Sequence, residues 1–138
     1  MATIAVKPLV LKDVLLKIGA DNYEMHVSSV KFVPASSTVQ WQGLTPDATF
    51  SDVAAPTYTC VLEFVQDWET ANSLSRYLWD NQGTTKAAEF VPVKGVGNLQ
   101  VSANLVIVPG SIGGAVNAFA TDSVTLGSDK PVLGTVSA

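Results

Sequence analysis

The chain of 138 residues has little charge for its size. Only 14% of its residues are charged, whereas a typical soluble domain has about 25%. Hydrophobic residues make up 47% of the sequence. A surface with so few charges is poorly hydrated unless other molecules cover part of it. Two interpretations follow: copies or partners cover the surface, or the chain is a monomer with an outer layer of Ser, Thr and Asn.

Histidine and cysteine occur once each, as His26 and Cys60. One cysteine excludes an internal disulfide and favours a cytoplasmic origin. Two nitrogen or sulfur ligands are too few for a transition-metal site. Cys60 alternates with apolar residues in the segment 57–65, so we expect a thiol in the core. His26 lies in a polar alternation and is expected to be solvated, and an enzyme that pairs the two residues is an alternative.

Long hydrophobic runs and chemical motifs are also absent from the sequence. Lysines and Asp13 interrupt the first twenty residues, so we expect neither a signal peptide nor insertion into a membrane. The net charge of −4 without a basic cluster argues against binding to a phosphate backbone. Residues 110–115, GSIGGA, lack the Gly-Lys-Ser/Thr ending of a phosphate loop, and Asp47 and Asp52 lack the spacing of a calcium loop. We therefore expect no enzymatic activity, no cofactor and no metal.

Alternation of polar and apolar residues predicts a mainly β chain. The expected fold is one domain, an antiparallel β-sandwich or barrel with one flanking α-helix. Pro92 predicts that its strand lies at a sheet edge, because proline lacks an N–H donor. Residues 1–9 are expected to form an N-terminal arm, 43–56 a long loop between strands, and 128–138 a C-terminal tail. The predicted strands are 10–18, 23–33, 38–42, 57–65, 86–93, 99–108 and 116–126.

Residues 66–83, QDWETANSLSRYLWDNQG, predict the helix. Asp67 suits the N-cap and Gly83 the C-terminal end. One narrow face is polar, and the opposite apolar arc is wider than packing on one sheet requires. We therefore expect part of this arc to contact another molecule. The arc contains Trp68, Leu74, Tyr77 and Leu78, with Trp79 at its border.

Three phrases occur together in an order typical of one family. They are W-x-G-L-T-P-D at 41–47, Q-D-W-E-T at 66–70 and P-G-x-I-G-G at 109–114. Over about residues 25–127 the chain resembles the major tail protein, or tail tube protein, of long-tailed, non-contractile bacteriophages of the siphophage type. The phrases are not chemical signatures, so their specificity comes from their joint occurrence.

The resemblance implies a structural protein of the virion, assembled in the cytoplasm of the bacterial host. Copies would form hexameric rings that stack into a tube, and double-stranded DNA would pass through this tube during ejection. One sheet of each copy would join its neighbours around the lumen. Implied partners are further copies, the tape-measure protein in the lumen during assembly, and the tail terminator and distal tail proteins.

Three surfaces receive expected roles under this resemblance. Polar strand faces are expected to line the bore, where acids would repel DNA, and six copies carry about six times the net charge of −4. The alternative for these strand faces is an ordinary solvated sheet face. The loop 43–56 is expected to stack the rings, and the alternative for it is a mobile surface loop. The candidates for the bore are Glu24, His26, Ser28, Thr57, Thr59, Glu63, Gln100, Ser102 and Asn104. The candidates for ring stacking are Leu44, Pro46, Asp47, Phe50 and Val53, and those for a subunit contact of the helix are Trp68, Leu74, Tyr77, Leu78 and Trp79.

Two other functions stay open at this point. The chain could be another ring-forming component, such as a tail terminator or the tube protein of an injection machine. It could also be a small monomeric β-barrel that binds a ligand.

Overall fold

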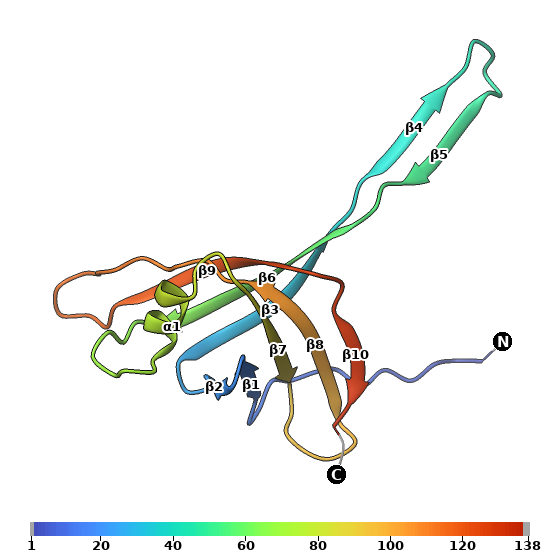
Figure 1. The fold of residues 1–138 in the computed structure, drawn as a ribbon. Helices are drawn as coiled ribbons and strands as arrows, with labels where there is room; N and C mark the ends of the chain where they lie inside the picture. The colour runs from blue at the N-terminus through green and yellow to red at the C-terminus, as the bar shows by residue number, and fades with distance from the viewer. Residues whose placement is uncertain (1, 137–138) are drawn as a thin grey trace.

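The chain forms a β-rich body from which one hairpin and the N-terminal segment project (Figure 1). The computed structural model describes residues 2–136. Its helix is α1, Leu74–Asp80. The strands are β1 Leu15–Ile18, β2 Asp21–Asn22, β3 Val27–Ala35, β4 Thr38–Gln42, β5 Thr49–Val53, β6 Thr57–Val65, β7 Thr85–Val91, β8 Leu99–Val106, β9 Thr121–Ser128 and β10 Val132–Thr135.

Eight strands form one antiparallel sheet in the order β2-β1-β7-β8-β9-β6-β3, with β10 beside β8. One edge of β8 pairs with β7. The other edge pairs with β9 only through Leu105 and Val106, and with β10 through Leu99–Ser102. Because β9 leaves β8 after this short pairing, the sheet bends there and forms two layers, β3–β6–β9 and β1–β7–β8–β10 (Figure 1). The rings of Phe32 and Phe90 meet between the layers, with centroids 6.2 Å apart.

The core lies between these two layers and continues beneath α1. Alternation along β6 places Cys60, Leu62 and Phe64 inside, as the sequence predicts. The same alternation along β8 buries Val101, Ala103 and Leu105. Among these, the leucine, valine and phenylalanine side chains contribute about 1.5–3 kcal/mol each when fully buried. The expected mainly β fold with one flanking helix is therefore confirmed.

The helix is shorter than expected and begins later. Its N-cap is Ser73, whose hydroxyl accepts a hydrogen bond from the Arg76 N–H, so the prediction of Asp67 as N-cap is wrong. Asp67 instead closes a turn, because its Oδ1 accepts the N–H groups of Glu69 and Thr70. These bonds lower the pKa of Asp67, with the Thr70 interactions the largest cause. Gly83 does follow the helix with a left-handed φ of 83°.

Several predictions of strands and segments are wrong in part, because tertiary pairing decided them. The strand predicted at 10–18 is shorter than expected and forms only β1, Leu15–Ile18. Residues 23–26 form a turn rather than the start of a strand. β7 lies between β1 and β8, so it is not an edge strand, and Pro92 follows its end. β9 begins at Thr121, and residues 116–120 are outside it. The expected C-terminal tail contains β10, which pairs with β8, while residues 137–138 of that tail and Met1 of the arm lie outside the described residues.

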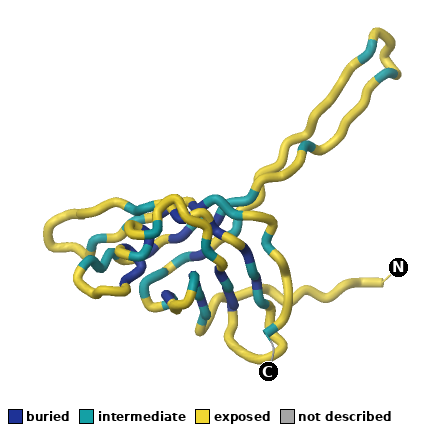
Figure 2. The backbone as a smooth tube through the Cα atoms, viewed as in Figure 1, coloured by how far each residue is buried: buried dark blue, intermediate teal, exposed yellow. Residues whose placement is uncertain are grey.

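Most of the expected loop 43–56 belongs to a β-hairpin, because it contains the connection between two strands and the second strand, β5. β4 and β5 pair in a sheet of their own, from Thr38 opposite Val53 to Gln42 opposite Thr49. Backbone bonds continue this ladder at both ends, from Gly43 N to Ala48 O and from Ala54 N to Ser37 O. Figure 2 shows that this hairpin is exposed along almost its whole length and lies away from the body.

Candidate assembly surfaces

The single cysteine and the single histidine lie in different parts of the fold and do not pair. Cys60 has no exposed surface, and burial raises the pKa of its thiol to about 12. His26 lies in the turn before β3, where its ring packs edge-on against Tyr23 with centroids 5.9 Å apart. Cys60 points into the core from the middle of β6, whereas residue 26 pairs with the far end of that strand through Val65 N–H and His26 O. Among residues 2–136, no group of three or more His, Cys, Asp or Glu is placed to hold a metal ion.

The β4–β5 hairpin presents two chemically different faces. Opposite residues in the pairing, such as Trp41 and Phe50, project to the same side, and successive residues alternate. One face therefore carries Val39, Trp41, Phe50 and Asp52. The rings of Trp41 and Phe50 contact each other, with centroids 5.8 Å apart, yet 60% and 65% of these residues remain exposed. We call Val39, Trp41 and Phe50 the aromatic face of the hairpin.

The opposite face is polar, with Gln40, Gln42, Thr49 and Ser51, and it includes Val53. Here the Thr49 hydroxyl donates to Gln42 Oε1 at 2.7 Å, which links the two strands. A solitary two-stranded hairpin is marginally stable in water, and this one exposes its apolar side chains. The hairpin therefore has the composition of a surface that another molecule covers.

The residues predicted for ring stacking all lie on this hairpin, but they do not share one face. Phe50 belongs to the aromatic face and Val53 to the polar one. Leu44, Pro46 and Asp47 lie in the exposed connection between the strands. Sequence reasoning missed Val39 and Trp41, although their alternation within TVQWQ was the signal that could have identified them.

Nine polar residues predicted to line a bore fall into three groups. Thr57, Thr59 and Glu63 lie on the outer face of β6, and Gln100, Ser102 and Asn104 lie on the outer face of β8. These strands belong to different layers, so their outer faces point in different directions and the structure does not bring the two sets together. Glu24, His26 and Ser28 do not form a strand face, because the turn at 23–26 and a bulge between Val27 and Ser29 interrupt the alternation.

Glu24 and Ser28 of the third group each have a local hydrogen-bond partner. The Glu24 carboxylate accepts the N–H of Leu16 at 3.4 Å. The Ser28 hydroxyl donates to the carbonyl of Glu63 at 3.2 Å. On the outer face of the β3–β6–β9 layer, Glu63 and Lys31 are the charged strand residues, and the remaining side chains are mainly hydroxyl-bearing or aliphatic. Such a face is close to neutral.

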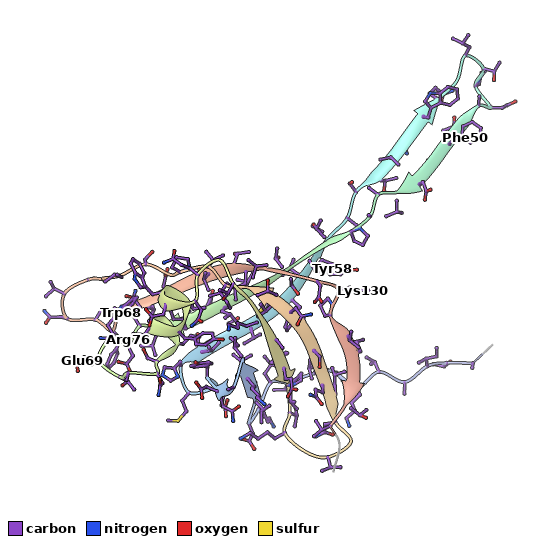
Figure 3. The ribbon with its side chains drawn as sticks, in the orientation of Figure 1. Phe50, Tyr58, Trp68, Glu69, Arg76 and Lys130 are labelled. Atoms are coloured by element: carbon purple, nitrogen blue, oxygen red, sulfur yellow. The ribbon has the colours of Figure 1, made fainter. Side chains whose placement is uncertain are left out.

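The helix supplies both core and surface residues. Leu74 and Leu78 have no exposed surface and belong to the core, so they cannot contact a neighbouring molecule in this structure, contrary to expectation. Tyr77 is partly buried against Tyr23, with ring centroids 5.5 Å apart. Trp68 and Trp79 pack edge to face at 6.1 Å, and Trp79 is 45% exposed. Figure 3 places Trp68 at the opposite end of the molecule from Phe50.

The exposed area of the whole chain is large for its size. It is 9478 Å², whereas a compact monomer of this mass exposes about 6,900 Å². The excess of roughly 2,600 Å² is about three times the area that one partner buries in a standard interface. Large apolar residues are exposed in the hairpin, in the N-terminal segment with Ile4, Val6 and Leu9, and in the loop after β8 with Ile112 and Phe119.

Comparison with solved structures identifies a similar fold, whereas no family model and no curated protein matches the sequence. A chain in the cryo-EM structure of the sheath–tube complex of an extracellular contractile injection system, PVC, in its extended state superposes with a TM-score of 0.62. The match covers 94% of this chain and 93% of that chain at 15% sequence identity. From this superposition, the chain has a tail-tube fold. Because the matching structure belongs to a contractile system, the non-contractile phage type stays a prediction.

No helix within residues 2–136 is long and apolar enough to cross a membrane.

Proposed function

We propose that this chain is the structural subunit of a tail tube, in which copies form rings and the rings stack through the β4–β5 hairpin. The observation that carries the proposal is this hairpin, which projects from a fold shared with a chain of a sheath–tube complex and exposes an aromatic face. A monomer gains nothing from such a face in water, because exposed apolar area costs about 25 cal/mol per Å² relative to burial. Docking on another copy removes that cost.

The ring itself is proposed to be a hexamer with a bore for double-stranded DNA. We assign the bore to the outer face of the β3–β6–β9 layer, which includes Thr57, Thr59 and Glu63. β3 is the end of the sheet order, so its free edge is available to pair with a neighbouring copy. Small hydroxyl side chains predominate on this face, and Glu63 balances the charge of Lys31, so the face presents no net positive charge to DNA phosphates.

Exterior contacts are assigned to the helix end of the body. Trp79, with Trp68 beside it, is the apolar group of α1 that remains accessible to a neighbour. Leu74 and Leu78 support this surface from below by fixing the helix on the core. The tape-measure protein in the lumen, and the terminator and distal proteins at the tube ends, complete the proposed set of partners in a virion.

The tube subunit of a contractile injection machine is a second candidate, and the similarity to the injection-system structure favours it. Particles purified from producing cells distinguish the two candidates. DNA-filled heads on bare tubes indicate the non-contractile phage tail, and headless sheathed tubes indicate the injection machine.

Negative-stain electron microscopy of the purified chain, together with light scattering, tests the proposal directly. We expect rings, and tubes of stacked rings as the concentration rises. A monodisperse monomer at high concentration, also in the presence of the other particle proteins, would reject it in favour of a monomeric binding domain.

Labelling of introduced cysteines tests the bore. Thr59→Cys should be protected from a bulky maleimide–polyethylene glycol in assembled tubes and should react after the tubes are dissociated. Asn104→Cys on the other layer should react in both states. The opposite pattern would move the bore to the β8 face.

A further inference from the structure

The β4–β5 hairpin is acidic as well as aromatic. No lysine or arginine occurs from residue 32 to residue 75, so nothing in the hairpin balances Asp47 and Asp52. Asp52 lies opposite Val39 on the aromatic face, and Asp47 is exposed in the connection between the strands. The surface that covers this hairpin must therefore combine apolar side chains with positive charge.

A groove with this combination occurs elsewhere on the same chain. It lies between the N-terminal segment and the turn between β7 and β8, and has a volume of about 350 Å³. Its apolar walls include Leu9, Val10 and Val93, and Lys7 and Lys12 lie among its lining residues. We call it the basic groove.

The charge beside the groove is positive overall. Lys94 follows its lining residue Val93 and forms an ion pair with Asp13, with 3.7 Å between Nζ and Oδ1. Lys7, Lys12 and Lys94 against Asp13 leave a net charge of +2 around the groove, and the hairpin carries −2. The two surfaces are thus complementary in charge and both are rich in apolar groups.

Hairpin and groove lie at opposite ends of the strands. Tyr58, which follows the hairpin, pairs with Ser128, and Ser128 pairs with Leu105 near the C-terminal end of β8. Leu99, which lines the groove, is at the N-terminal end of β8. An eight-residue strand is about 26 Å long, and the hairpin points away from the body (Figure 1). The two surfaces of one chain are therefore placed to meet those of other copies.

We infer that the hairpin of one copy docks in the basic groove of a second copy, with its aromatic face on the apolar walls and its two acids beside the lysines. This inference rests on the proposed tube function and names the receiving surface. Two different patches make the contact heterologous, so each copy keeps a free hairpin or groove for the next copy, and the contact does not stop at a pair. An isologous contact between two hairpins would instead bring four acids together and stop at a pair.

Charge reversal tests the docking because each surface can be inverted alone. Asp47→Lys with Asp52→Lys makes the hairpin positive, and Lys7→Glu with Lys12→Glu makes the groove negative. Each double variant should need at least about tenfold more protein than the wild type to form tubes, while ring formation is unchanged. The variant that combines all four substitutions should stack again, because its two surfaces attract.

Mixing the two double variants gives a second readout. Rings of the hairpin variant have a positive hairpin and a positive groove, and rings of the groove variant have a negative hairpin and a negative groove. At the protein concentration at which the wild type forms tubes, neither should stack alone, but an equal mixture should form tubes of alternating rings. Raising the salt concentration from 0.1 to 1 M should weaken wild-type stacking, because it shortens the Debye length from about 10 Å to about 3 Å.

The matched control reverses two exposed acids away from both surfaces, Asp21→Lys with Glu69→Lys. It changes the net charge as much as the hairpin variant and should leave stacking unaltered. Two results would show that the groove is not the receiving surface while the tube function stands. In the first, the hairpin variant stacks as well as the wild type; in the second, the wild type stacks but the variant with all four substitutions does not. If the wild type forms neither rings nor tubes, the proposed function itself fails.

Discussion

Excision of the hairpin should separate folding from assembly in this chain. β3 and β6 are antiparallel neighbours, and Ala35 lies opposite Thr57 at the point where the connection leaves them. Replacing residues 36–56 by Asn-Gly would therefore convert the pair into a regular two-residue hairpin, for which this dipeptide is the preferred turn. The excised segment contains no buried residue, so the core is untouched.

The expected change in stability is small and favourable. Loop-closure entropy grows with (3/2)RT ln n, so shortening residues 36–56 to two residues lowers the cost of closure by at most about 2 kcal/mol. Pairing of β4 with β5 already shortens the effective loop in the native chain, which reduces this gain. We expect an unfolding free energy equal to that of the wild type or up to about 2 kcal/mol higher.

Assembly should be lost in the same variant. Urea unfolding followed by circular dichroism measures stability, and negative-stain microscopy measures tube length. A matched variant, Trp41→Ser with Phe50→Ser, keeps the hairpin but removes its aromatic surface, and should retain rings with few or no tubes. Tubes of normal length from the excised chain would refute the role of the hairpin, and an unfolded excised chain would refute its independence from the core.

Three further predictions test other parts of the structure. Leu78→Ala should lower the unfolding free energy, measured by urea unfolding, by about 2–5 kcal/mol because it leaves a cavity. Trp79→Ala should change this free energy little but should reduce lateral assembly, measured as the fraction of protein in rings. Gly19→Ala should destabilise the chain by about 1–2 kcal/mol, because an alanine is strained at the φ of 67°. The new Cβ would also lie 2.6 Å from the Tyr77 hydroxyl oxygen, which should destabilise the chain further. Adding Tyr77→Phe should relieve this steric clash but not the backbone strain. Burial raises the pKa of the Cys60 thiol from 9.0 to about 12, so the unfolding free energy should fall as the pH rises above 9. The loss from this thiol should be about 2 kcal/mol at pH 10.5, and Cys60→Ala should remove it. Equal pH profiles of the unfolding free energy for both proteins would contradict the buried thiol.

Much of the fold was predictable because a sheet with one buried face leaves a period of two in the sequence. Cys60, Leu62 and Phe64 on β6, and Val101, Ala103 and Leu105 on β8, show that period and are buried. The low charge also predicted that copies or partners cover part of the surface, and this stays a prediction. Cys60 was correctly expected in the core, whereas His26, which was expected to be solvated, packs against Tyr23 with its Nδ1 buried.

Several features could not be predicted because distant partners decide them. β7 is internal although Pro92 predicted an edge, since the ladder ends one residue before the proline. β10 is a strand because it pairs with Leu99–Ser102 of β8, on the edge that β9 leaves unpaired after Leu105 and Val106. α1 begins at Leu74 rather than near Asp67, because Asp67 satisfies N–H groups of a preceding turn instead.

The sequence by itself determined the class of the molecule: alternation set which side chains of β6 and β8 enter the core, and composition determined how little charge remains outside. Only the tertiary structure decided how the outer surfaces are arranged. It separated the polar faces of β6 and β8 into two layers, joined β4 and β5 into a projecting hairpin with an aromatic face, and placed the basic groove at the other end of β8. The physical reason is that the period of a strand records burial locally, whereas the direction of an exposed face depends on where the sheet bends and which strands it pairs.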